Sequence, residues 1–234
     1  MNKTMEWLAS FPVMILMALS IGCVSQAQAS VALGATRVIY PADQKQVKLP
    51  VTNNDEMSTF LIQSWIENAD DKKDGRFLIT PPLVAMKGKK ENTLRIVNVS
   101  NKQLPQDRES LFWINVKAIP GMDKASENKN TLQLAIISRI KLLYRPVNLS
   151  LPPDQAAEKL RFKRAAGQLS LINPTPYFLT VTELYVGNTE LEGTLVPPMG
   201  EITVTLPANA GRDISYKTIN DYGALTPKLK AIMQ

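Results

Sequence analysis

Alternation of apolar residues with other residues is the feature of this sequence that most restricts its fold. Val47, Leu49 and Val51 alternate with Lys48 and Pro50, and the same period of two recurs through most of the chain after its N-terminal segment. A period of two places successive side chains on opposite faces of a strand, so it predicts half-buried β-strands. No long segment shows the period of 3.6 residues that is typical of an amphipathic helix. The sequence therefore predicts an all-β protein.

Turn residues separate the predicted strands. Asp70–Gly75 has the composition of a hairpin tip, and pairs of prolines interrupt the chain elsewhere. Besides the segments around Leu49 and Phe60, strands are predicted at Leu94–Val99, Leu111–Ile119, Thr131–Tyr144, Leu169–Ile172, Tyr177–Val186, Glu201–Leu206 and Ile214–Asn220. Short strands without crossover helices favour antiparallel sandwiches, and about 205 residues suit two sandwiches of immunoglobulin-like size.

The N-terminal segment has the pattern of a secretory signal peptide. Lys3 precedes an apolar run over residues 11–24, which ends in the sequence AQAS at Ala27–Ser30. The run is too short to span a bilayer as a helix, and its small residues suit cleavage before Ser30. We therefore expect residues 1–29 to be removed and the mature protein to lie outside the cytoplasm. An alternative treats Cys23 as a lipid-attachment cysteine, which would leave the later Ala-x-Ala site without a purpose.

Composition excludes several classes of enzyme. Removal of Lys3 and Glu6 lowers the 27 basic residues to 26 and the 21 acidic residues to 20, so the net charge stays +6. The only cysteine, Cys23, is lost as well, and the chain has no histidine. Histidine-based triads and metal ligands are therefore excluded, and packing alone must hold the mature domains. No nucleophile elbow, phosphate loop or metal cluster is found, so we expect no enzyme activity, no cofactor and no metal.

Two charged segments have ordinary explanations. The basic turn Lys87–Glu91 has no flanking aromatic residues on which bases would stack, so we expect no nucleic acid to bind. Asp70, Asp71 and Asp74 do not follow the spacing of a calcium loop, because Lys72 and Lys73 interrupt them.

A proline-rich segment predicts the boundary between the two domains. Arg145–Asp154, with the sequence RPVNLSLPPD, carries three prolines that stiffen a short linker. We therefore expect an N-terminal domain over residues 30–148 and a C-terminal domain over residues 149–234.

One predicted strand is unusually long. Thr131–Tyr144 would extend roughly 45 Å, whereas most strands end at about 10 residues. Leu132, Leu134 and Ile136 lie on one face of it. Most such strands face the core of their own sandwich. If this strand is an open edge instead, its apolar side chains invite another chain to pair with it.

Several segments resemble the periplasmic pilus chaperones of the chaperone-usher pathway. They are SVALGATRVIYP (30–41), LPQDRESLFWINVKAIP (104–120), QLAIISRIKLLYRP (133–146), NPTPYFLTVTEL (173–184) and INDYGALTP (219–227). The resemblance covers essentially the whole mature chain. Within the family, the chain closely resembles the chaperones of type 1 fimbriae. It implies two immunoglobulin-like domains in a boomerang arrangement. It also implies a protein that lends a β-strand to pilus subunits and delivers them to the outer-membrane usher.

The resemblance implies a role for two cations. Arg37 and Lys141 match the cleft residues that anchor the terminal carboxylate of a subunit in this family. Charge-assisted hydrogen bonds to a carboxylate contribute about 1.5 to 3 kcal/mol each, which suits that role. By alternation, Arg37 shares a face with apolar residues at positions 31, 33, 35 and 39, which favours a partner anion, although most arginines on strands are simple surface charges.

Two further groups of residues take roles from the resemblance. Leu132, Leu134 and Ile136 match the donor-strand residues that fill the groove of an incomplete pilin. Strict alternation places Lys141 on the opposite face, so either the strand bulges near Ile137 or the anchor and donor faces differ. The resemblance also implies a cluster of ion pairs between the domains, formed by Glu109, Arg145 and Asp221.

The sequence leaves one alternative to the chaperone function. A fimbrial structural subunit or adhesin would be incorporated into fibres, but pilins typically carry a disulfide, which the mature chain cannot form. The exposed apolar edge also leaves open a weak self-association of the free protein.

Overall fold

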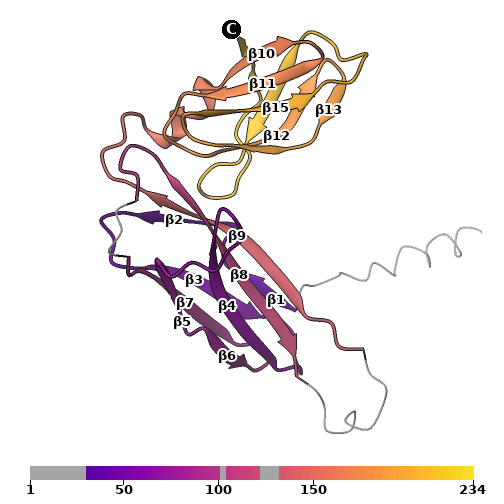
Figure 1. The fold of residues 1–234 in the computed structure, drawn as a ribbon. Coiled ribbons are helices and arrows are strands. Elements are labelled where there is room, and N and C mark those ends of the chain that lie inside the picture. Colours follow the sequence, from indigo (N-terminus) through magenta and orange to yellow (C-terminus); the bar gives the residue numbers. More distant parts are fainter. Residues whose placement is uncertain (1–29, 101–103, 122–131) are drawn as a thin grey trace, which may run out of the picture. The chain divides into compact units, whose positions relative to one another are not determined.

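A computed structural model describes residues 30–100, 104–121 and 132–234 of the chain (Figure 1). Two sheets form around the first hydrophobic core. The four-stranded sheet has the order β1-β3-β7-β5, and the five-stranded sheet has the order β2-β9-β8-β4-β6. The strands are β1 (Val31–Leu33), β2 (Arg37–Pro41), β3 (Val47–Asn53), β4 (Phe60–Asn68), β5 (Phe77–Thr80), β6 (Leu83–Met86), β7 (Glu91–Asn98), β8 (Ser110–Pro120) and β9 (Ile136–Arg145).

Two more sheets form around a second core. One has the order β15-β11-β10-β18, and the other has the order β13-β12-β16-β17, with β14 also paired to β12. Two short 3-10 helices, η3 (Pro153–Gln155) and η4 (Ala157–Lys159), precede these strands. The strands are β10 (Arg161–Ala165), β11 (Gln168–Asn173), β12 (Leu179–Val186), β13 (Thr189–Leu191), β14 (Thr194–Val196), β15 (Gly200–Thr205), β16 (Ile214–Thr218), β17 (Leu229–Lys230) and β18 (Ile232–Met233).

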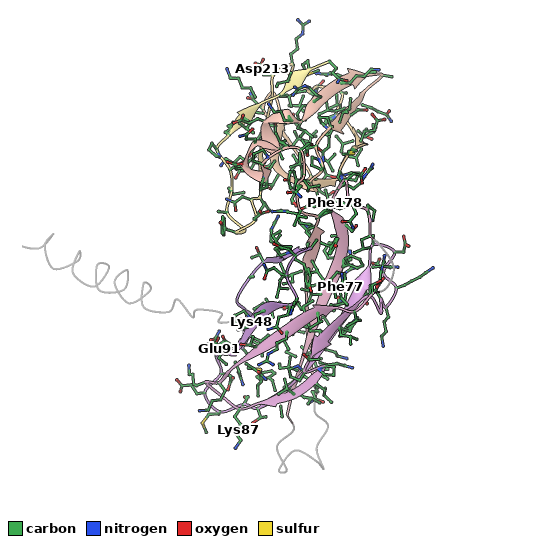
Figure 2. All side chains as sticks on the ribbon, turned by 90° about the vertical axis from the view of Figure 1, so that its left-hand side faces the viewer. Lys48, Phe77, Lys87, Glu91, Phe178 and Asp213 are labelled. Atoms are coloured by element: carbon green, nitrogen blue, oxygen red, sulfur yellow. The ribbon has the colours of Figure 1, made fainter. Side chains whose placement is uncertain are left out.

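Each pair of sheets encloses its own core, as the alternation predicts. In β8, Phe112, Ile114 and Val116 are buried in the first core, and the residues between them face outward. Phe77 lies among the strands of this core and contacts Phe112, with ring centroids 4.7 Å apart (Figure 2). The second core contains Phe162 and Tyr216, with centroids 5.1 Å apart. The prediction of two all-β sandwiches is confirmed.

The hairpin tip predicted at Asp70–Gly75 is confirmed as a turn. Glu67 and Lys73 form an isolated antiparallel bridge, and the side chain of Asn68 accepts hydrogen bonds from the amides of Asp70 and Lys72, each at 3.0 Å. The chain reverses here because the asparagine satisfies backbone donors that have no strand partner.

The strand predicted at Thr131–Tyr144 is shorter than expected. Strand β9 begins at Ile136, and the preceding residues from Leu132 have no regular structure; Thr131 lies outside the described residues. The pairing between β8 and β9 ends at Ala118 and Ile136. Strand β8 continues to Pro120, but its pairing with β9 stops at Ala118, so the described residues before Ile136 join no ladder.

The expected alignment of Arg37 with the preceding apolar residues is wrong. Val31 and Leu33 belong to β1 of the four-stranded sheet, whereas Arg37 begins β2 of the five-stranded sheet. The chain passes from one sheet to the other between these strands, so a single alternation does not continue through them. Within β2, Val38 and Tyr40 face the core, and Arg37 faces the outer side of the sheet.

Candidate functional site

Arg37 and Lys141 are neighbours on adjacent strands. Strands β2 and β9 run parallel, and Arg37 is the register partner of Lys141. The core takes Val38 from β2 and Leu142 from β9, so both cations lie on the outer face of the five-stranded sheet. The fold thus brings together two residues that are about a hundred positions apart in the sequence.

Arg37 is unusually buried for a cation at the edge of a sheet. The residue as a whole is only 9% exposed, and its Nη1 atom donates a hydrogen bond of 3.1 Å to the carbonyl of Ile219. Its Nε atom is buried without a hydrogen-bond partner among the described residues. Gly223, at a φ of 83°, lets the loop after β16 approach Thr36, because a Cβ there would lie 2.3 Å from the threonine hydroxyl. Arg37 therefore keeps unused donor capacity in a desolvated position.

Burial also affects the protonation of both cations. Desolvation lowers the pKa of Lys141, and the adjacent Arg37 lowers that pKa further. Desolvation likewise lowers the pKa of Arg37, opposed by the carboxylates of Asp221 and Glu109. Neither cation forms an ion pair within 4.0 Å in the part of the chain that the structure describes. Two close, partly desolvated positive charges without a direct counter-ion form a site suited to an anion.

The three donor-strand residues are exposed to solvent. Leu132 is 85% exposed, Leu134 is 68% exposed and Ile136 is 69% exposed. Large apolar side chains with this exposure contribute little to the core of their own sandwich. The interpretation that they face their own core is therefore wrong for the described structure.

The edge of β9 is open over its first half. Strand β2 pairs only with Lys141–Arg145, whereas β8 pairs with β9 from Ile136 onward. From Ile136 to Ile140, one edge of β9 therefore has no strand partner among the described residues. Such an edge offers backbone donors and acceptors to an added strand.

Strand β9 has no bulge near Ile137 in its pairing with β8. Pairing runs without a shift from Ser110 and Tyr144 to Ala118 and Ile136. Ile136 and Lys141 therefore lie on opposite faces of β9, because no bulge brings their side chains to the same face. An added strand would meet apolar side chains on one face and the cations on the other.

Glu109, Arg145 and Asp221 are brought together in a cluster of hydrogen-bonded ion pairs. Arg145 donates from Nε to Glu109 at 2.7 Å, and from Nη1 and Nη2 to the two carboxylate oxygens of Asp221 at 2.7 and 2.8 Å. The second oxygen of Glu109 accepts the backbone amide of Phe178 at 2.8 Å. The guanidinium also lies over the ring of Tyr177, 5.0 Å from its centroid. The cluster therefore joins β9 to segments that pack on the second core.

Burial and ion pairing act in opposite directions on the charged groups of this cluster. The side chain of Glu109 is 0% exposed, and burial raises its pKa while Arg145 and the Phe178 amide oppose that shift. Burial alone would lower the pKa of Arg145, but the hydrogen bonds and charges of Asp221 and Glu109 together outweigh burial and raise that pKa. The bidentate pair with Asp221 fixes the orientation of the guanidinium as well as its charge.

Sequence reasoning missed two features of the outer face. The first is Trp113, whose ring lies 5.6 Å from the Nζ atom of Lys141 and 4.3 Å from the guanidinium of Arg139. Alternation within Leu111–Ile119 is sufficient to place Trp113 opposite the core. Its neighbours on other strands depend on the register, which the sequence does not state.

The second missed feature is an apolar patch at the far side of the same sheet. Leu61 is 38% exposed and Leu83 is 54% exposed, both on the face opposite the core. Leu61 pairs with Ala85 on one side and Ile119 on the other. We call Leu61, Leu83, Ala85 and Ile119 the outer apolar patch. Apolar residues that are neighbours on the outer face of a sheet are typical of binding surfaces.

Other kinds of site are not found in the described ranges. No group of three or more histidine, cysteine, aspartate or glutamate residues there is arranged to hold a metal ion. No helix in these ranges is long and apolar enough to cross a membrane.

Two family models match the chain. Residues 30–150 match the N-terminal domain of PapD, a pili and flagellar-assembly chaperone, and residues 155–230 match the C-terminal domain of the pili assembly chaperone PapD. The chain therefore belongs to the PapD family of pilus assembly chaperones. This class of proteins is not enzymatic, so the resemblance and the expected lack of enzyme activity are both confirmed.

Individual relatives are similar over nearly the whole chain. Chaperone protein FimC of Escherichia coli O6:H1 is 70% identical over 220 residues, which cover 94% of this chain and 91% of FimC. Chaperone protein FocC of Escherichia coli is 64% identical over 212 residues, covering 90% of this chain and 93% of FocC. These similarities place the chain among fimbrial chaperones.

Solved structures agree with the fold. The crystal structure of the periplasmic chaperone SfaE is 62% identical, with a TM-score of 0.77, and the match covers 86% of this chain and 99% of SfaE. A chain from the Salmonella enterica complex of SafA pilin with the SafB chaperone is 32% identical, with a TM-score of 0.79, covering 88% of this chain and 97% of that one.

Proposed function

We propose that this protein is a periplasmic chaperone that binds pilus subunits by strand donation and delivers them to an outer-membrane usher. The observation that carries this proposal is the combination of the open edge of β9, three exposed apolar side chains and an adjacent pair of cations. A relative of known structure forms a complex with a pilin, which supports pilus subunits as the ligands. The family match favours this function over that of a fimbrial subunit or adhesin.

Strand donation accounts for the exposed apolar residues. Leu132, Leu134 and Ile136 would enter an apolar groove of the subunit, while backbone groups of β9 pair with its strands. Burial of each side chain contributes roughly 1.5 to 3 kcal/mol before the cost of ordering residues 132–135. That segment lacks regular structure here, so it would become ordered when a subunit binds.

The cation pair provides a binding site for the C-terminus of the subunit. Arg37 and Lys141 would bind its terminal carboxylate, with the free donors of Arg37 oriented by the bond to Ile219. A carboxylate fixed at this place sets the register of the strand that pairs along β9. Anchor and donor groups therefore have separate roles: the cations fix the register, and the apolar side chains supply most of the buried area.

Delivery requires a second surface, because a bound subunit covers the donor edge. The outer apolar patch lies on β4, β6 and β8, away from the open edge of β9 in the strand order of the sheet. We propose that the usher binds there. Replacement of Leu83 by glutamate would then leave subunit capture unchanged and reduce binding to the usher.

The N-terminal segment and the domain limits complete the proposal. Residues 1–29 act as a signal peptide that directs the protein to the periplasm. The relative SfaE is described as a periplasmic chaperone, which supports this location. Residues 30–148 form the domain that carries the donor edge and residues 149–234 form the second domain, with Glu109, Arg145 and Asp221 linking them.

Co-purification of a subunit from periplasm tests the proposal. We expect Arg37→Ala and Lys141→Ala to lose most of the captured subunit, because each removes a charge from the anchor. Lys48→Ala is the matched control, since Lys48 lies on β3 of the other sheet (Figure 2). Undiminished capture by both folded anchor variants would show that the cation pair does not bind the subunit.

A further inference from the structure

Four side chains form a row across the outer face of the five-stranded sheet. Glu67 of β4 is the register partner of Trp113 of β8, Trp113 is the partner of Lys141 of β9, and Lys141 is the partner of Arg37 of β2. Adjacent strands lie about 4.8 Å apart, so Trp113 stands between Glu67 and Lys141, which are two strand spacings apart. We refer to these four residues as the outer row.

The ring of Trp113 contacts cations. The Nζ atom of Lys141 lies 5.6 Å from the ring centroid, and the guanidinium carbon of Arg139 lies 4.3 Å from it. Both distances fall within the range of attraction between a cation and an aromatic face. Trp113 is half-buried and faces away from the core, so its ring is held by its neighbours on the sheet.

Lys141 needs such a contact because of the groups around it. Arg37 carries a like charge on the neighbouring strand, which favours movement of the ammonium away from the anchor. Glu67 is the carboxylate directly beyond Trp113. A lysine stem is long and flexible, so without the ring Lys141 would be able to turn toward Glu67 and form an internal ion pair, which would make its ammonium unavailable to the ligand.

The other charged groups near the ring leave Glu67 able to bind Lys141. Glu67 accepts a hydrogen bond of 2.7 Å from Nε1 of Trp65, and its second oxygen lies 3.5 Å from Arg139. Arg139 also pairs with Asp71 of the hairpin tip. Arg139 is thus shared between two carboxylates, and Glu67 retains acceptor capacity.

We infer that Trp113 is a positioning residue of the anchor, which holds the Lys141 ammonium beside Arg37 and separates it from the Glu67 carboxylate. This inference rests on the proposed function, since it concerns the residue that keeps the anchor free for the subunit. The carboxylate of Glu67 and the terminal carboxylate of the ligand compete for Lys141. The ring disfavours the internal carboxylate and leaves Lys141 to the terminal carboxylate of the ligand.

Four variants test the competition. The probe is a type 1 pilus subunit of Escherichia coli, and the measured quantity is its affinity for the purified chaperone. We expect Trp113→Ala to weaken binding on the order of tenfold. Trp113→Phe keeps a ring and should bind nearly as well as the unchanged protein. Glu67→Gln alone should have little effect, because an amide still accepts the Trp65 hydrogen bond.

The double variant separates positioning from simple structural damage. Trp113→Ala combined with Glu67→Gln should recover most of the lost affinity, because no internal carboxylate is left to bind Lys141. Damage to the sheet would not be repaired by a change at Glu67. Unchanged affinity in Trp113→Ala, or a loss that the second substitution does not restore, would overturn the inference.

Titration of Lys141 by NMR gives a second readout that needs no ligand. In Trp113→Ala the pKa of Lys141 should rise, since Glu67 then stabilises the charged form, and Glu67→Gln should abolish that rise. Lys141→Ala is included in the binding series. Retained affinity in Lys141→Ala would refute the anchor itself, whereas an unaltered Lys141 pKa in Trp113→Ala would refute the role of Trp113 alone.

Discussion

Lys141 shows how a residue useful for binding can reduce the stability of the free protein. Its ammonium is partly desolvated, lies beside Arg37 and has no ion pair within the described ranges. Its pKa is lowered in the folded chain, so the unfolded chain binds the proton more tightly. Stability contributed by this site therefore rises as the pH passes upward from the lowered pKa to the ordinary pKa of lysine.

Replacement of Lys141 by methionine should separate stability from binding. We expect the free energy of unfolding at neutral pH to increase by about 1 kcal/mol or less, because the ammonium is still partly hydrated. Subunit capture should fall in the same variant. Urea unfolding and co-purification measure the two effects, and a variant that is less stable than the unchanged protein would contradict this account.

The same shift predicts how capture depends on pH. A terminal carboxylate binds the charged form of Lys141, so affinity should decline with rising pH at values below those at which an ordinary lysine loses its proton. Titration of subunit affinity from neutral to alkaline pH measures this decline. In Lys141→Arg the decline should move to higher pH, because a guanidinium stays protonated.

At the scale of the element, β9 divides into two functional parts. From Lys141 onward it is held between β2 and β8, and its core-facing residues pack in the first core. Before Lys141 it has one open edge, and the segment from Leu132 precedes the paired part of the strand. The strand therefore keeps its fold through one half and can offer the other half to a partner.

A charge placed in the donor segment should affect binding without affecting folding. Leu134→Asp changes a side chain that is 68% exposed, so we expect the free energy of unfolding to change by less than about 0.5 kcal/mol. Subunit affinity should fall at least roughly tenfold, because a carboxylate would enter an apolar groove. Leu78→Asp on β5, where Leu78 is 51% exposed, is the control and should bind normally. Equal binding by both variants would exclude Leu134 as a donor residue.

At the scale of the whole molecule, the cluster of Glu109, Arg145 and Asp221 ties β9 to the second set of sheets. Its members differ in exposure: the side chain of Glu109 is 0% exposed, whereas that of Asp221 is 33% exposed. A buried charge left without its partner costs far more than an exposed one. The consequences of removing each partner should therefore be unequal.

Arg145→Met should destabilise the protein by about 3 to 5 kcal/mol, because it leaves Glu109 buried and unpaired. Asp221→Asn should cost about 1 kcal/mol or less, since its carboxylate is partly hydrated. Urea unfolding at neutral pH measures both. In Arg145→Met the pKa of Glu109 rises further above its unfolded value, so the loss of stability should shrink as the pH falls and Glu109 becomes protonated. Equal losses in the two variants would contradict this account.

The sequence by itself determined the all-β class, the positions of most strands and the family. Alternation gives these results because it records which side chains of each strand face a core, for example Phe112 and Ile114 of β8. The resemblance also assigned roles to Arg37, Lys141 and the donor residues. Those roles come from motifs that local sequence preserves, and they stay predictions until binding is measured.

Only the tertiary structure decided which strands are neighbours and where they end. Arg37 pairs with Lys141 because the chain changes sheets between β1 and β2, an event that alternation within a strand does not record. Strand β9 begins at Ile136, where its pairing with β8 stops opposite Ala118. The outer row that places Trp113 between Glu67 and Lys141 likewise depends on the register of three strands. Register is a property of pairing between distant segments, so the geometry of the anchor appears only when the sheet is assembled.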